Sequence, residues 1–197
     1  NKIKKNMLIG VFFKMDTHYK KFSIYIEGIK RLIRFVEQDK NNYILRLFID
    51  NNVYADKQIM DILKSSKKIE LVLFKCMNYL DINKKYHLDL FATLVRFFPM
   101  FDFDYNDAKN LTMIDIDTKD EDFYRINAIV NMKKQENPDE IELIGAGALD
   151  NLLYNNKLPY TYAGNISLNN KKFDKNILIN FINNIEMNKS KGHYNKR

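Results

Sequence analysis

The sequence predicts an α/β fold of the Rossmann type, in which a mostly parallel sheet carries helices on both faces. Short apolar runs suited to buried strands alternate with amphipathic stretches at helical spacing, and the alternation continues as far as Pro138. The chain has 197 residues, 46% of them hydrophobic and 13% aromatic, which is enough to bury a sizeable core. We find no internal repeat and no obvious linker, and we expect a single domain over 1–197.

The first half of the chain supplies three strands and two helices in this pattern. Residues 7–14 (MLIGVFFK) form an apolar run typical of a buried strand. Residues 19–38 carry apolar side chains at helical spacing and predict an amphipathic helix. We expect a second strand at 43–50, a short helix at 55–66 and a third strand at 68–76.

The second half continues the alternation. A helix is expected from about residue 85 to 98, because Pro99 disfavours the helical conformation of the residue before it. The fourth strand is expected at 111–116, and a helix over 120–134 begins with acidic residues that suit a helix N-terminus. Further strands and helices are then less regular, with a strand in 160–169 and a helix over 173–187.

Composition excludes several classes of protein. No apolar run approaches the roughly 20 residues that cross a bilayer, so we expect no transmembrane segment. The chain opens NKIKKN, without a signal peptide, and we expect a domain taken from a longer polypeptide, cut at one or both ends. Cys76 is the single cysteine, which fits a reducing, cytoplasmic compartment. Heavy use of Lys, Asn and Ile suggests an AT-rich genome, of a low-GC microbe or of a large DNA virus, whose protein would occupy host cytoplasm or virion.

The positive charge is concentrated near the end of the chain. The net charge is +7, and residues 171–197 hold seven basic side chains against two acidic ones. Such an excess attracts nucleic acid, acidic lipid or a phosphorylated small molecule, or is simply a solvated surface. Aromatic residues do not interleave with the basic ones as in RNA-binding modules, and we expect no nucleic-acid partner.

The stretch NLTMIDIDTKDED, residues 110–122, places five acidic side chains behind an apolar run. Asp115 and Asp117 are separated by one residue at the expected strand end. In an extended chain both carboxylates point the same way, with α-carbons roughly 7 Å apart, and they can grip one hard cation. A solvated turn is the alternative interpretation.

Phosphatases of the haloacid dehalogenase type use a similar D-x-D-x-T pattern. That pattern usually follows the first strand of the fold, with the first Asp as nucleophile and the second as acid. Here three strands come first, and Thr118 in DIDTK stands one place too early. The spacing argues against this class.

Three separate pieces of the chain resemble the retaining glycosyltransferases of the glycogenin and bacterial galactosyltransferase type, which have the GT-A fold. KMDTHYKKF offers the Asp and Tyr that follow the first strand of that family, and FATLVRFFPMF precedes the D-x-D strand LTMIDIDT. YTYAGNISLNN resembles the family's N-(A/S)-G strand. Their order and spacing cover most of the chain.

The resemblance implies a function and a set of site residues. Asp115 and Asp117 would hold Mn²⁺ or Mg²⁺ on the diphosphate of a UDP-sugar, and with Arg96 would carry catalysis by stabilising charge on the departing nucleotide. A hexose would pass to an unknown protein or glycan acceptor with retention of configuration, by front-face attack. Donor contacts would come from Asp16, Tyr19, Arg96, Ile116 and Gly164.

Four of these five donor contacts have a structural alternative. Arg96 is also read as a surface arginine on an amphipathic helix, and Tyr19 as a packing residue at a helix start. Asp16 is also read as a helix cap, and Gly164 as a bend in a strand.

The chain departs from the family in two places. Tyr162 stands where the family has an Asn, and His193 does not match the family's third metal ligand. A non-catalytic GT-A-like domain, which would contact an acidic partner through the basic tail, is therefore a second hypothesis. The sequence leaves open whether the protein forms a homodimer.

Overall fold

The computed structural model describes residues 5–14, 21–40, 42–74, 95–101, 108–132, 143–145, 166–169 and 173–188. Within them, six strands form one sheet in the order β3-β2-β1-β4-β6-β5. The strands are β1 (Lys5–Phe12), β2 (Tyr43–Ile49), β3 (Ile69–Leu73), β4 (Ala108–Met113), β5 (Leu143–Gly145) and β6 (Ile166–Asn169).

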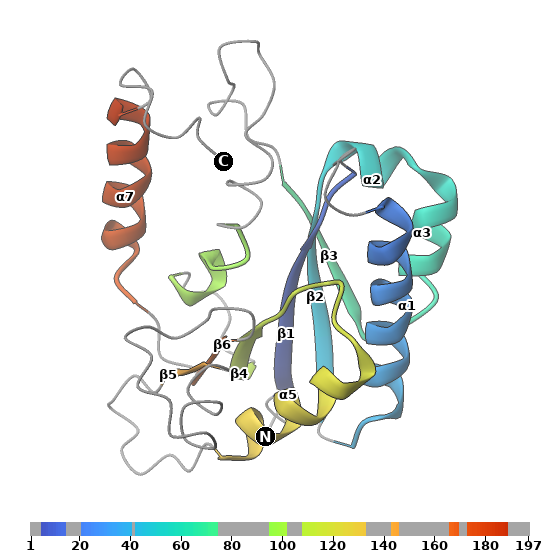
Figure 1. Cartoon of the computed structure of the whole chain (residues 1–197). Coiled ribbons are helices and arrows are strands. Elements are labelled where there is room, and N and C mark those ends of the chain that lie inside the picture. The colour runs from blue at the N-terminus through green and yellow to red at the C-terminus, as the bar shows by residue number, and fades with distance from the viewer. Residues whose placement is uncertain are drawn as a thin grey trace.

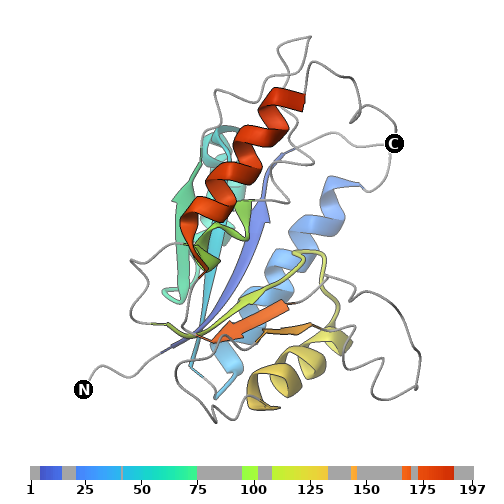
Figure 2. The ribbon, with the colours of Figure 1, turned by 90° about the vertical axis from the view of Figure 1, so that its left-hand side faces the viewer.

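The four strands β3, β2, β1 and β4 are parallel to their neighbours. Strand β6 lies beside β4 and runs in the opposite direction, and it is also antiparallel to β5 (Figure 2). β1 is nearly fully buried, and β2 is buried except at Arg46, which is half-buried; such near-continuous apolar strands are typical of parallel sheets covered on both faces. The expected α/β fold with a mostly parallel sheet is confirmed.

Helices lie on both sides of this sheet (Figure 1). The helical segments are α1 (Phe22–Gln38), α2 (Asn51–Ala55), α3 (Lys57–Leu63), the short 3₁₀ turn η1 (Phe98–Met100), α5 (Asp120–Met132) and α7 (Lys175–Asn188). Helices α1, α2 and α3 lie on one side, and η1 and α7 lie on the other.

The core under α1 is built by helical periodicity meeting strand alternation. Ile29, Leu32 and Val36 of α1 are buried and pack with Leu8 and Leu45 of the sheet. Helix α5 joins the same core through its buried residues. A hydrogen-bond chain ties the layers together, because the hydroxyl of the fully buried Tyr43 donates to Asn127 Oδ1 at 2.7 Å and Asn127 Nδ2 donates to Asp39 at 3.1 Å.

The opposite face carries a second apolar cluster. Met7 and Ile9 of β1 pack there with Val95 and Met100 from the segment that holds η1. Helix α7 is connected to η1 just before it begins: Phe173 donates its backbone N–H to the Met100 carbonyl at 2.8 Å, and its ring lies 5.5 Å from that of Phe101.

Two element boundaries differ from expectation. The helix expected at 55–66 is the shorter α3, whose start is capped by Asp56, which accepts from Ile59 N at 3.2 Å; helix α2, which precedes it, was not expected. The fourth strand ends at Met113 rather than at 116. Most of the helix expected over 85–98 lies outside the described residues. No helix among those that are described is long and apolar enough to span a bilayer.

Candidate metal and nucleotide site

The acidic motif follows β4 at the point where the strand order of the sheet reverses. The chain passes from β1 outward to β2 and β3, then returns to the other side of β1 as β4. The two central strands stay paired to the end of β4, where Ile114 N donates to the Ile9 carbonyl at 2.8 Å. In open α/β sheets, ligands bind beyond the carboxyl ends of the strands at such a reversal.

Asp115 and Asp117 lie in a turn, and the expectation of an extended chain with both carboxylates on one face is wrong. The carbonyl of Asp115 accepts from Thr118 N at 3.3 Å and also from the Thr118 hydroxyl. These two bonds close the chain over residues 115–118. Thr118 is buried, so the turn is held from inside the protein.

The turn is anchored by β1 and α1. Ile116 is buried, and its side chain fills the space beside Gly10, where an added Cβ would lie 2.9 Å from Ile116 Cγ2. Gly28 of α1 approaches so closely that a Cβ there would lie 1.9 Å from the Ile116 carbonyl oxygen. Arg31, one helical turn further, donates from Nε to the Thr118 carbonyl at 3.1 Å. Any contact of Ile116 with a nucleotide would therefore use its backbone.

Asp115 projects away from this anchored base and meets Arg96. The Asp115 side chain is 50% exposed, and its Oδ1 accepts from Arg96 Nη1 in a charged hydrogen bond. Arg96 is only 13% exposed, and its guanidinium carbon lies 5.3 Å from the ring centre of Phe97. Arg96 is thus a mostly buried cation facing the acidic motif, and the interpretation as a surface arginine is wrong.

The remaining carboxylates of the acidic stretch belong to helix α5. Asp120, Glu121 and Asp122 occupy its first turn, where negative charge is favourable beside the helix N-terminus. Asp122 accepts from Lys119 N at 2.9 Å, which satisfies a backbone donor at the helix start. The acidic cluster therefore combines a helix start with two candidate ligands, Asp115 and Asp117.

The neighbouring edge, at the ends of β1 and β2, is also polar. Lys14 follows β1 and pairs with Asp56 at 3.3 Å. The hydrogen bond from the backbone N–H of Ile59 lowers the pKa of the Asp56 carboxyl, and the positive charge of Lys14 lowers this pKa further. Asp50 is buried at the end of β2 and caps α2 through Val53 N at 2.9 Å. Asp16 and Tyr19 come directly after this edge in sequence.

Two carboxylates suit a hard cation that takes its other ligands from substrate and water. Asp115 and Asp117 are two residues apart, so their α-carbons are at most about 7 Å apart. Asp117 is half-buried and is engaged by a neighbouring group. Among the described residues no group of three or more His, Cys, Asp or Glu side chains gathers as a metal cage. Mg²⁺-type sites with one or two carboxylates plus phosphate oxygens fit this donor set.

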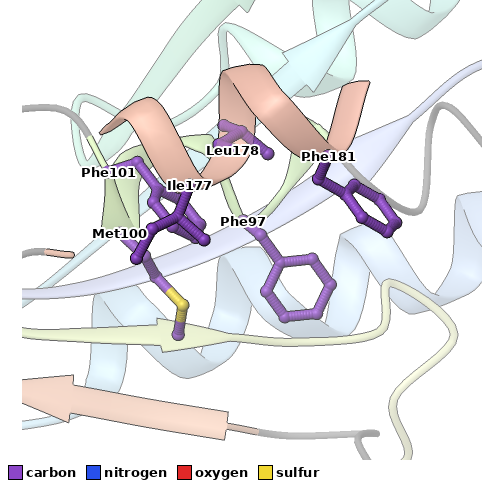
Figure 3. Close-up of a pocket in the computed structure, with 6 residues that line it drawn as sticks. All are labelled: Phe97, Met100, Phe101, Ile177, Leu178 and Phe181. Atoms are coloured by element: carbon purple, nitrogen blue, oxygen red, sulfur yellow. The ribbon is translucent and has the colours of Figure 1, made fainter. Parts of the chain in front are cut away.

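An apolar pocket of about 260 Å³ lies beside Arg96, between the η1 segment and α7 (Figure 3). Phe97, which stacks on the Arg96 guanidinium, forms part of its wall. The lining side chains are Phe97, Met100, Phe101, Ile177, Leu178 and Phe181, and none of them carries a polar group. The pocket is therefore lined only by apolar side chains, and Phe97 is the residue that links it to Arg96.

Several predicted site residues lie outside the described part of the chain. They are Asp16, Tyr19, Tyr162, Gly164 and His193. Sequence reasoning also missed residues that hold the turn, namely Gly28, Arg31 and Thr118. A glycine inside a strongly amphipathic helix was an available signal, because such a glycine usually has a packing reason.

Comparison with known protein families, with curated proteins and with solved structures finds no match to this chain.

Proposed function

We propose that this chain is a metal-dependent glycosyltransferase domain of GT-A type, which transfers a hexose from a UDP-sugar with retention of configuration. The observation that carries the proposal is the pair formed by Asp115 and the mostly buried Arg96 at the reversal point of the parallel sheet. A carboxylate for a cation and a guanidinium for phosphate oxygens lie in contact there, where ligands of such sheets bind.

The residues divide the work in the proposed reaction. Asp115 and Asp117 would bind Mn²⁺ or Mg²⁺, which supplies Lewis-acid stabilisation of the departing diphosphate. Arg96 would donate to the same phosphate oxygens, with its guanidinium over the ring of Phe97. The bond from the anomeric carbon to the phosphate oxygen breaks as a bond to the acceptor oxygen forms on the same face. The acceptor proton passes to the leaving phosphate.

The position of the motif in the fold also supports this class over the phosphatase. The D-x-D pair follows β4, the fourth strand in sequence, rather than the first. Thr118 is buried and donates its hydroxyl to the backbone of Asp115, so it is committed to the turn.

Thermal unfolding with Mn²⁺ and UDP tests the proposal. A ligand at 100 times its Kd stabilises a folded protein by about 2.7 kcal/mol, which for a chain of this size raises Tm by roughly 5–11 °C. We expect that rise for the wild type and its loss in Asp115→Asn and Asp117→Asn. Glu121→Gln is the matched control, since Glu121 is an exposed carboxylate four residues beyond Asp117.

The result that overturns the proposal is an unchanged Tm with millimolar Mn²⁺ and UDP. That outcome would favour the non-catalytic domain. If the Tm does rise, a screen of UDP-sugars for Mn²⁺-dependent release of UDP identifies the donor.

A further inference from the structure

Arg96 forms a charged hydrogen bond with Asp115 and also has a buried N–H group without an acceptor. Its Nη1 donates to Asp115 Oδ1, while its Nε is buried and has no hydrogen-bond acceptor among the described residues. A buried N–H without an acceptor destabilises the folded protein, more so when the group is charged, so natural proteins rarely leave one without a reason. The guanidinium carbon lies over the Phe97 ring, 5.3 Å from its centre.

The charges at this point cannot accommodate a bare cation easily. Asp115 is paired with the guanidinium, so a divalent cation that binds Asp115 either displaces Arg96 or lies against its positive charge. Like charges in contact repel strongly in a partly buried site. A diphosphate removes the conflict, because its oxygens are acceptors for the guanidinium once Asp115 binds the metal.

We propose that Arg96 is the resident counter-ion of Asp115 and exchanges this carboxylate for nucleotide phosphate when the metal binds. This inference rests on the proposed function and adds a regulatory property to the same site. The guanidinium keeps the acidic motif from binding a cation in the absence of nucleotide. Metal and nucleotide then bind as a unit, and free Mn²⁺ or Mg²⁺ alone binds weakly.

Binding of Mn²⁺ alone, followed by the electron paramagnetic resonance signal of the free ion, tests this exchange without any turnover. Arg96→Met should bind Mn²⁺ at least tenfold more tightly than the wild type, because it removes the competing charge and keeps an apolar stem. The same variant should bind UDP at least tenfold more weakly when Mn²⁺ is saturating. Arg96→Lys keeps a positive charge and should bind Mn²⁺ alone as weakly as the wild type.

Arg46→Met is the matched control. Arg46 is 12% exposed and pairs with Glu70 at 2.5 Å on the β2–β3 part of the sheet, so its removal deletes a similarly buried guanidinium–carboxylate pair elsewhere. Its Mn²⁺ affinity should stay within threefold of the wild type.

The outcomes separate this inference from the proposed function. A wild type that binds Mn²⁺–UDP, with Arg96→Met no tighter for Mn²⁺ alone, overturns the counter-ion role and leaves the proposed function standing. A wild type that binds no Mn²⁺–UDP overturns both.

If Arg96→Met does not fold, a second measurement on the wild type tests the exchange. It follows the Nε–H resonance of Arg96, which is assigned by its absence in Arg96→Lys. This resonance should shift when Mg²⁺ and UDP are added together, and an unmoved resonance refutes the exchange.

Discussion

Replacing Gly28 by Ala tests whether helix α1 holds the acidic turn in place. Gly28 lies in the middle of α1, on the buried side that faces residues 115–118. A Cβ at this position would lie 1.9 Å from the Ile116 carbonyl oxygen and 2.9 Å from the α-carbon of Asp117. Real Cβ atoms essentially never come closer than 3.0 Å to another atom, so helix and turn would have to separate by about 1 Å.

The size of the effect follows from two opposing terms. Alanine favours a helix interior over glycine by about 1 kcal/mol. Overpacking costs typically 1–3 kcal/mol, and here the upper end applies because the opposing atoms are backbone and no side-chain rotation relieves the contact. We therefore expect a net loss of about 2 kcal/mol in the free energy of unfolding, or roughly 4–8 °C in Tm for a chain of this size.

The assay is urea unfolding followed by circular dichroism, with Gly10→Ala as the matched control. Gly10 also contacts Ile116, but its added Cβ would meet the ends of side chains, Ile116 Cγ2 at 2.9 Å and Leu47 Cδ2 at 3.2 Å. These are side-chain atoms, which can shift by a few tenths of an ångström more easily than backbone can, and a strand interior favours Ala over Gly by about 0.5–1 kcal/mol. Gly10→Ala should change stability by less than about 1 kcal/mol.

A Gly28→Ala protein as stable as the wild type, or more stable as helix propensity alone would make it, refutes the close approach of α1 to the turn. The same variant carries a second readout. If Gly28 sets the position of Asp115 and Asp117, the Tm rise caused by Mn²⁺ and UDP should shrink by more than half in Gly28→Ala and stay intact in Gly10→Ala.

Two further predictions concern buried polar contacts. Asp50→Ala removes the acceptor of Val53 N at the start of α2 and should lower the free energy of unfolding in urea by about 1 kcal/mol. Asp50→Asn keeps an acceptor and should cost less than half of that, so equal losses in the two variants would contradict the capping role. Tyr43→Phe deletes the 2.7 Å bond to Asn127 and should cost about 1–2 kcal/mol at neutral pH. Burial, and to a smaller extent the negative charge of Asp39, raises the pKa of Tyr43 in the folded state. The stability that neutral Tyr43 contributes is therefore fully present below about pH 10, where unfolded tyrosine ionises, and is lost as the pH rises further. The urea midpoint of the wild type should consequently fall more between pH 8 and 10.5 than that of Tyr43→Phe, and parallel losses would refute the link.

The fold could be predicted because its signals are local and strong. Strands β1 and β2 are continuous apolar runs, and the buried positions Ile29, Leu32 and Val36 of α1 follow the helical period. The strand order was not predicted, because it depends on which apolar runs pair, and each of them suits a central position equally well. The reversed direction of β6 has the same cause.

The shape of the site could not be predicted from the motif alone. The pattern LTMIDI reads as a strand through Ile116, because alternating apolar residues look the same whether they line a sheet or insert into a core from a turn. What decides is tertiary: Ile116 packs between Gly10 and Gly28, two residues far away in sequence. A local signal existed in Thr118, since an Asp followed three residues later by a hydroxyl side chain suits a tight turn.

The two ends of the turn differ in how firmly they are held, and this difference supports the proposed site. Its base is fixed by Gly28, by the Arg31 bond to the Thr118 carbonyl and by the buried Thr118 itself. Its outer end carries the half-exposed carboxylate of Asp115, which accepts a charged hydrogen bond from Arg96. A rigid base limits the reorganisation needed when a ligand arrives, while the charged outer end can change partners. A surface turn with no such duty would need neither a glycine pressed against its backbone nor a buried guanidinium held over its carboxylate.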